Sequence, residues 1–248
     1  MFSSRVRKVT ERMQDKRKFC TAIVAAAGSS QRMGGENKLL LPLCGAPVIA
    51  WTLRALDRAE TVDAIVVAAR EEDILSYGEI AKTYNIQKPL FIVRGGETRL
   101  ASVSLALQHA PEKTTLFAVQ DGARPLVQPV TIDSAVRKAQ LCGAAAPAIP
   151  VKDTVKVAEN GIVRETPDRS RLYAVQTPQV FDADLLKAAL AAAVKDGAAI
   201  TDDCSAVERL GKEIYLTEGN DENLKITTPT DLLMAEAILN RRLTEEWS

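Results

Sequence analysis

The chain has 248 residues, 46% of them hydrophobic, which is enough for one large domain with a buried core or for two small ones. Its 32 Lys and Arg residues are balanced by 32 Asp and Glu residues, so no overall charge favours nucleic acid or an acidic membrane as a partner. No apolar run is long enough to cross a membrane, and a single histidine, His109, excludes a multi-histidine zinc site.

Two features of the sequence indicate the cellular setting. The four cysteines (Cys20, Cys44, Cys142 and Cys204) are far apart and form no C-x-x-C pair, as is typical of reduced, buried thiols in a cytoplasmic protein. Residues 1–18 carry seven basic and two acidic side chains and lack the apolar stretch of a secretory signal. We expect a basic, disordered tail there, or a start site placed too early with Met13 as the alternative.

Strand and helix patterns alternate from Phe19 onward. Short apolar runs predict strands at 20–25, 64–69, 90–93, 115–119 and 144–149. Apolar residues at helical spacing predict one helix with Pro47 as its first residue and another over about 100–110. This alternation predicts an α/β fold, with a Rossmann-like, mostly parallel sheet and helices on both faces.

The alternation of strand and helix patterns stops after Pro150. Two alternating runs, 155–158 and 162–165, flank Glu159-Asn160-Gly161, and Asn-Gly between such runs is a strong hairpin signal. The hairpin has too few apolar residues to pack alone. We therefore expect a protruding β-hairpin arm at about 151–173 that is buried against a second copy of the chain, giving a homodimer.

The α/β pattern returns after the arm. Helices are predicted at 184–195 and 202–210, and each is followed by a glycine. Strands are predicted at 213–217 and 224–227, before a last helix with Thr228 as its N-cap and Pro229 as its first residue. Because the sequence contains no internal repeat and no low-complexity linker, we expect one domain over residues 19–248.

The loop after the first predicted strand has the composition of a phosphate-binding site. The segment AAAGSSQRM (25–33) begins with small residues that let a ligand approach the backbone, whose N–H groups can hold phosphate oxygens. Arg32 and Lys38 add two cations. This combination suits a nucleoside triphosphate, although an ordinary turn with two solvated cations fits the same spacing.

Two common nucleotide motifs are absent from this region. A P-loop requires G-x-x-x-x-G-K-[ST], and no Gly-Lys pair lies between Gly28 and Gly35. A dinucleotide fingerprint requires G-x-G-x-x-G, of which only Gly28 is present. The sequence therefore disfavours a P-loop kinase, an ATPase or a nicotinamide-dependent oxidoreductase.

Taken together, the motifs resemble the nucleotidyltransferases that make nucleotide-activated sugars and alcohols. Within this group the chain is similar to the methylerythritol phosphate cytidylyltransferases of the non-mevalonate isoprenoid pathway. Seven segments carry the resemblance, in the family's order and over nearly everything from Phe19 on: AAAGSSQRM with Lys38, GGETRLASV (95–103), DGARP (121–125), PVKDT (150–154), DRSRLYAVQTPQVF (168–181), TDD (201–203) and NLKITTP (223–229).

The resemblance implies a reaction and its small-molecule substrates. CTP and 2-C-methyl-D-erythritol 4-phosphate would give 4-diphosphocytidyl-2-C-methyl-D-erythritol and pyrophosphate. The nucleophile would be the phosphate of the alcohol substrate, which is already ionised near neutral pH, so no general base is required. The resemblance also implies Mg²⁺, held mainly by the nucleotide phosphates rather than by a protein site.

The same resemblance implies a role for each matched position. It places Arg32 and Lys38 on the triphosphate and Lys225 on the reacting phosphates. The nucleotide pocket would be lined by Ala26, Ala27, Gly28, Gly96, Ser102 and Asp121. The alcohol phosphate would be held by Asp121, Arg124, Thr154, Arg169 and Thr201. Because Thr154 and Arg169 flank the hairpin, the resemblance implies that they reach the partner subunit's site.

Local structural roles remain open for these residues. Asp121 is also suited to cap a loop, Arg124 and Arg169 to be solvated charges, and Thr154 to be a strand residue. We expect Thr201 to act both as an N-cap and as a ligand contact.

Two other functions stay open on the sequence. A ribitol 5-phosphate cytidylyltransferase shares the glycine loop, the QTPQ stretch and the terminal lysine, although the DRS segment followed by Leu172 and the PVKDT segment favour the methylerythritol enzyme. A nucleotide-binding protein that has lost catalysis is disfavoured because Arg32, Lys38, Asp121, Arg169 and Lys225 are all retained.

Overall fold

Strand β1 (Cys20–Ala26) lies inside the central sheet of the computed structural model, which describes residues 17–28 and 37–245. It pairs in parallel with β4 and β6, and β4 pairs in parallel with β5. The bounds of these neighbours are β4 (Ala64–Ala69), β5 (Leu90–Arg94) and β6 (Leu116–Asp121). All of them coincide closely with the apolar runs of the sequence.

The other half of the sheet is mixed. Strand β7 (Ala144–Pro150) pairs in parallel with β12 (Tyr215–Glu218) and antiparallel with β10 (Tyr173–Val175) and β11 (Gln179–Asp182). Strand β11 also pairs antiparallel with β6. The antiparallel strands follow the arm, because the chain leaves the sheet after β7 and must run back along it on its return. Four of the seven pairings are parallel, so the predicted α/β class is confirmed with a mixed edge.

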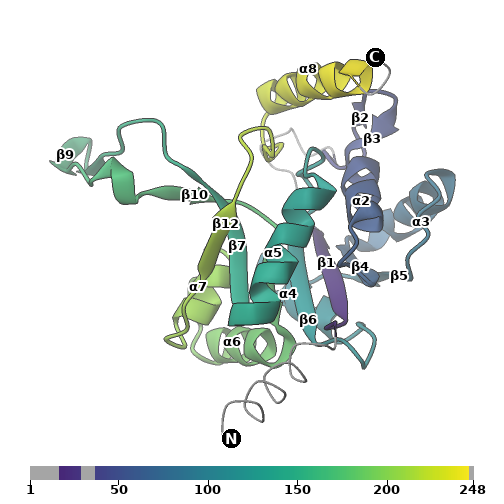
Figure 1. Ribbon diagram of the computed structural model, residues 1–248, viewed down its shortest axis with the longest axis horizontal. Coiled ribbons are helices and arrows are strands. Elements are labelled where there is room, and N and C mark those ends of the chain that lie inside the picture. The colour runs from purple at the N-terminus through teal and green to yellow at the C-terminus, as the bar shows by residue number, and fades with distance from the viewer. Residues whose placement is uncertain (1–16, 29–36, 246–248) are drawn as a thin grey trace, which may run out of the picture.

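Helices cover both faces of the sheet (Figure 1). One face packs against α2 (Val48–Arg58), α3 (Ile74–Thr83), α5 (Pro129–Cys142) and α8 (Pro229–Glu245). The opposite face packs against α4 (Arg99–Leu107), α6 (Ala183–Lys195) and α7 (Asp203–Glu208). Strand β1 shows the alternation: Ala22 and Val24 belong to the first core and Ile23 to the second. The predicted two-sided burial is confirmed.

The predicted arm is a hairpin of β8 (Val157–Glu159) and β9 (Ile162–Glu165), which reaches away from the sheet at the left of Figure 1. Both turn residues have positive φ, 50° at Asn160 and 76° at Gly161, as the Asn-Gly signal indicates. A short 3₁₀ helix, η3 (Arg169–Arg171), follows on the return. Six apolar side chains of this region are 38–58% exposed: Val155, Val157, Ile162, Val163, Tyr173 and Val175.

Three local predictions were wrong. Pro47 is the N-cap of α2 rather than its first helical residue, because its ψ of 147° is extended. Helix α7 spans only Asp203–Glu208. Residues 224–227 form no strand: Ile226 donates its N–H to the Ala123 carbonyl of a loop and is fully buried there, so its apolar character reflects packing beneath that loop.

Several elements were not predicted. Helices α3 and α5 were missed, as were the small hairpin β2 (Pro42–Leu43) and β3 (Ala46–Pro47), the 3₁₀ turn η2 (Glu71–Asp73), and strands β10 and β11. The start of α8 was predicted correctly, and there Asp231 accepts hydrogen bonds from the backbone N–H groups of Thr227 and Thr228.

The proposed tail falls mostly outside the described residues, because only Arg17 and Lys18 of it are described. Arg17 pairs with Asp63 at 2.7 Å and Lys18 with Asp182 at 3.4 Å. Within residues 17–28 and 37–245, the helices are all too short or too polar for a bilayer span.

Candidate active site

A cavity of about 340 Å³ opens where β1 and β6 end. Ligands of α/β sheets commonly bind at the carboxyl ends of the strands, and the small residues that end β1 leave room there. Residues from distant parts of the chain line the cavity: Ala25, Ala26, Ala27, Gly28, Lys38, Leu39, Gly96, Glu97, Thr98, Arg99, Ser102, Asp121, Ala123 and Lys225. The structure therefore brings together eight of the residues that the sequence singled out. Arg32 lies outside the described residues.

The loop between β5 and α4 is held tightly against the end of β1. A Cβ atom on Gly95 would lie 2.5 Å from Cβ of Ala27, so only glycine permits this approach. The Ser102 hydroxyl accepts from the N–H of Gly96 at 3.1 Å and lies 2.8 Å from the carbonyl oxygen of Thr98. Ser102 thus fixes the loop that forms one wall of the cavity.

Asp121 is the charged centre of the site and is only 7% exposed. Its Oδ2 lies 2.9 Å from Nζ of Lys225 and 3.4 Å from Nε of Arg124, and its Oδ1 lies 3.7 Å from Nε of Arg99. Burial alone would raise the pKa of Asp121, but Lys225, Arg99 and Arg124 outweigh it and hold the pKa below its ordinary value. Asp121 is therefore an ionised carboxylate within a cationic cluster.

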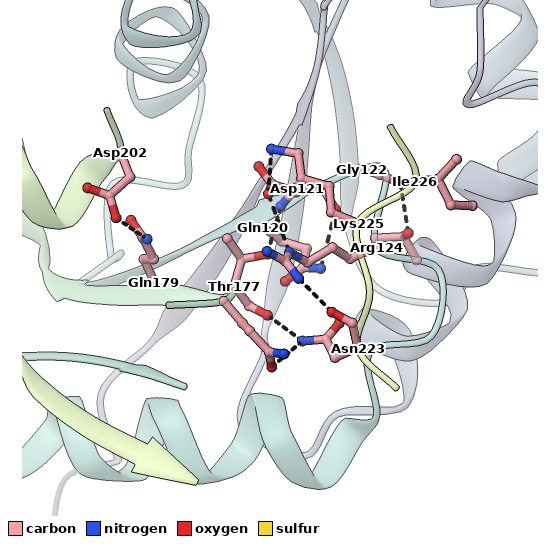
Figure 2. Close-up of polar contacts among 12 residues, drawn as sticks. Gln120, Asp121, Gly122, Arg124, Thr177, Gln179, Asp202, Asn223, Lys225 and Ile226 are labelled. Atoms are coloured by element: carbon pink, nitrogen blue, oxygen red, sulfur yellow. Dashed lines mark hydrogen bonds and ion pairs between the residues drawn. The ribbon is translucent and has the colours of Figure 1, made fainter. Parts of the chain in front are cut away.

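The segment that carries Lys225 is tied to the strands by side-chain amides (Figure 2). Asn223, which is 1% exposed, donates from Nδ2 to the Thr177 carbonyl at 3.1 Å and to Oε1 of Gln176 at 3.2 Å. The Asn223 carbonyl accepts from Nη1 of Arg124 at 2.5 Å. The Thr177 hydroxyl accepts from the backbone N–H of Asp121 at 3.1 Å, so Thr177 links Asp121 to Asn223, two residues before Lys225.

Lys38 reaches the same segment from the opposite end of the chain. Its Nζ donates to the carbonyl oxygen of Ile226 at 2.8 Å, one residue beyond Lys225. Lys38, Lys225 and Arg99 all line the cavity, so any ligand bound there meets three cationic residues.

Arg99 lines the cavity but was not predicted as a site residue, although it lies within the GGETRLASV segment. Its Nη1 lies 2.6 Å from Oδ2 of Asp203, which is fully buried. Burial raises the pKa of Asp203, and Arg99 only partly offsets that effect. Oε1 of Gln179 accepts from the N–H groups of Asp203 and Cys204 and thereby fixes the start of α7.

Four predicted ligand residues do not line the main cavity. Arg124 lies behind Asp121, with its guanidinium held by Asp121 and Asn223. Thr201 lines a neighbouring cavity of about 260 Å³. It is not the N-cap of α7 as predicted: Asp202 fills that position and accepts from the Ser205 N–H in a capping box. Thr154 and Arg169 are exposed on the arm, where Arg169 donates to the Lys152 carbonyl at 2.7 Å.

The carboxylates in the cavity lining are Asp121 and Glu97. In the part of the chain that the structure describes, no three His, Cys, Asp or Glu side chains gather as a ready-made metal site. Carboxylate oxygens are nevertheless the ligands that hard cations prefer, so Asp121 can contribute to a cation that a ligand brings with it.

Comparison with known proteins gives one consistent family. Residues 20–241 match the family described as 2-C-methyl-D-erythritol 4-phosphate cytidylyltransferase. The chain is similar to the enzymes of that name from Trichormus variabilis (41% identity over 222 residues, 89% of this chain and 97% of the relative) and Bacillus anthracis (43% over 221 residues, 89% and 97%).

Solved structures agree with this result. The chain resembles 4-diphosphocytidyl-2C-methyl-D-erythritol synthase from Anaerococcus prevotii with a TM-score of 0.83, at 29% identity over 92% of this chain and 99% of that one. It also resembles the 2-C-methyl-D-erythritol 4-phosphate cytidylyltransferase from Thermus thermophilus with a TM-score of 0.72, at 31% identity over 89% and 98% of the two chains.

The charged state of Asp121 predicts a pH-dependent stability difference. Near neutral pH, Asp121→Asn should lower the free energy of unfolding by about 1–3 kcal/mol, because the largely buried Arg124 loses its carboxylate partner, whereas Arg99 keeps Asp203 and Lys225 is partly exposed. The pKa of Asp121 is lowered on folding, so its contribution is present above the unfolded-state pKa, about 3.8, and is lost as pH falls through the folded-state value. The difference between the wild type and the variant should therefore shrink only below about pH 4.

Urea unfolding of both proteins across this pH range provides the measurement. Asp221→Asn is a matched control, because Asp221 forms an ion pair with Lys152 that is largely exposed and should contribute less than about 1 kcal/mol. A gap between the wild type and Asp121→Asn that stays constant down to about pH 3 would show that folding does not lower the pKa of Asp121.

Proposed function

The chain belongs to the 2-C-methyl-D-erythritol 4-phosphate cytidylyltransferase family, and from this premise we propose how its residues perform the family's reaction. The protein is a CTP-dependent nucleotidyltransferase of isoprenoid precursor biosynthesis. It joins CTP and 2-C-methyl-D-erythritol 4-phosphate to give 4-diphosphocytidyl-2-C-methyl-D-erythritol and pyrophosphate. The family match favours this activity over a ribitol 5-phosphate cytidylyltransferase and over an inactive nucleotide-binding protein.

The chemistry requires charge stabilisation rather than proton abstraction. A phosphate oxygen of the alcohol substrate forms a bond to the α-phosphorus of CTP. The bond from that phosphorus to the oxygen bridging the β-phosphate breaks, and its electrons leave with pyrophosphate. Catalysis then depends on positioning and on cations near the α-phosphate. The chain's one histidine, His109, is exposed at the end of α4 and does not line the cavity.

Lys38 and Lys225 are proposed to supply this charge, together with Arg32. The observation that supports the assignment is their convergence: Nζ of Lys38 bonds to Ile226, and Nζ of Lys225 bonds to Asp121, so both ammonium groups are fixed at the cavity wall. The backbone of Ala26, Ala27, Gly28 and Gly96 would accept the nucleotide, with Ser102 holding the loop in place.

We propose that the alcohol phosphate is held by Asp121, Arg124, Thr154, Arg169 and Thr201. Thr201 and Arg124 lie next to the cavity rather than in its lining. Bound substrate would have to extend toward Thr201 past Arg99, which lines both cavities.

Mg²⁺ and a cytoplasmic setting are also part of this proposal. Mg²⁺ would be held mainly by the nucleotide phosphates, with Asp121 as a protein ligand, and would supply neutralisation of phosphate charge. The four cysteines are all free thiols, which supports a reducing compartment.

A pyrophosphate-release assay tests the activity directly. Purified protein should release pyrophosphate from CTP in the presence of methylerythritol phosphate, and much less from UTP. Release that requires ribitol 5-phosphate instead would assign the sister activity, and equal use of UTP would point to a sugar uridylyltransferase. Binding of CTP without release under any condition would indicate a catalytically inactive protein.

The Lys225→Ala variant tests the proposed charge stabilisation. Turnover should fall by about 10²–10³-fold, the scale of removing one preorganised charge-stabilising group. The melting temperature should fall only moderately, because Asp121 loses its nearest partner but keeps Arg124 and Arg99 beside it. Lys212→Ala, which removes an exposed lysine outside the cavity, is the control. Activity of Lys225→Ala within about threefold of the wild type would exclude Lys225 from the mechanism.

We also propose a homodimer in which the hairpin arm of each chain lies over the other subunit. The arm exposes apolar side chains that its own subunit does not cover, and Thr154 and Arg169 at its base do not line their own cavity. A two-fold contact would place each arm over the other subunit, where Arg169 could bind the phosphate of the alcohol substrate through charge-assisted hydrogen bonds.

Subunit mixing tests this arrangement. Chains carrying Arg169→Ala and chains carrying Lys225→Ala, each nearly inactive alone, are combined and allowed to exchange. A mixed dimer would have one site with both lesions and one intact site, so activity should recover to roughly a quarter of the wild type. Absence of recovery despite verified exchange would mean that Arg169 serves its own subunit.

A further inference from the structure

The pair formed by Arg99 and Asp203 has no role in the mechanism described so far, yet it adjoins the centre of the site. Asp203 is fully buried at the first turn of α7, and its carboxylate lies 2.6 Å from Nη1 of Arg99. Burying a carboxylate is costly, and such a pair is weak support for stability by itself. Its placement beside the cavity therefore suggests a function other than stability.

Arg99 lies between two carboxylates. On one side Oδ2 of Asp203 forms an ion pair with Nη1 at 2.6 Å, and on the other Nε lies 3.7 Å from Oδ1 of Asp121. Oδ2 of Asp121 is engaged by Lys225 and Arg124. An arginine free of Asp203 could instead form a bidentate pair with Asp121, because its planar fork matches a carboxylate.

The position of Asp203 is itself fixed. Oε1 of Gln179 accepts from its N–H at 3.0 Å and from that of Cys204 at 3.1 Å, and Nε2 of Gln179 donates to Asp202 at 2.6 Å. Figure 2 shows the last of these contacts beside the Asp121 cluster. The side chain of Gln179, the first residue of β11, thus fixes the backbone that carries Asp203.

We propose that Asp203 is a positioning residue for the transferase reaction: it holds Arg99 back from Asp121 and so leaves Oδ1 of Asp121 open to the cavity. This inference rests on the proposed function, since the open oxygen is the one available to the bound substrates. Asp203 does not line the cavity and acts only through Arg99.

Asp203→Asn is the informative substitution, because it keeps the side-chain volume and the backbone bonds to Gln179 while removing the charge. The value of kcat/KM should fall by about 10- to 100-fold, as is usual when a reacting group is misplaced by about 1 Å. In a crystal structure of the variant, Arg99 should lie at about 2.8 Å from Oδ1 of Asp121 instead of 3.7 Å. Cys204→Ala is the matched control, since Cys204 is 4% exposed on the same helix and has no side-chain bond to Arg99.

A double-mutant cycle separates positioning from a structural role. If Asp203 acts through Arg99, the Arg99→Ala/Asp203→Asn protein is no less active than Arg99→Ala alone. Additive losses would overturn the proposal, as would wild-type activity in Asp203→Asn or an unchanged distance between Arg99 and Asp121. If Asp203→Asn cannot be purified, Asp203→Ser carries the same test with a smaller neutral side chain.

The crystallographic distance does not depend on the reaction. If the wild type releases no pyrophosphate, the proposed function is wrong. If the wild type is active but Arg99 does not move in the Asp203→Asn variant, only the role of Asp203 is wrong.

Discussion

A carboxylate taken out of water needs charged partners, and Asp121 imposes that requirement on the whole cavity. Its partners come from three regions: Arg99 at the start of α4, Arg124 in the loop after β6, and Lys225 near the C-terminus. Arg124 is only three residues away, but Arg99 and Lys225 reach Asp121 only when α4 and the C-terminal segment are packed beside the sheet. The electrostatic centre of the site therefore depends on the complete fold.

The QTPQ stretch (176–179) holds in place two of the segments that surround Asp121 and Arg99. Gln176 and Thr177 hold Asn223 and with it the segment of Lys225, while Gln179 holds the start of α7 and with it Asp203. These residues carry out no chemistry of their own. They link the return from the arm to both polar segments beside the cavity, which gives this part of the resemblance a structural reason.

Sequence patterns predicted correctly those elements whose structure depends on neighbouring residues. The apolar strands, the Asn160-Gly161 turn and the start of α8 at Pro229 all depend on neighbouring residues. The failure at 224–227 has the opposite cause, since Ile226 is buried by a loop contact to Ala123 that no pattern records. Cavity residues such as Lys38 and Lys225 were found through the resemblance to a family, whereas spacing alone left their role open.

The Arg99–Asp203 pair could not be found from spacing either, because its meaning depends on two segments meeting in space. The same long separations govern when the site can form. The bond from Lys38 to Ile226 spans 188 residues and that from Arg124 to Asn223 spans 99, so their closure entropy is paid only once most of the chain is ordered. On the ribosome, a growing chain can order its first strands early. It gains a competent cavity only after the segment that carries Asn223, Lys225 and Ile226 has emerged and docked.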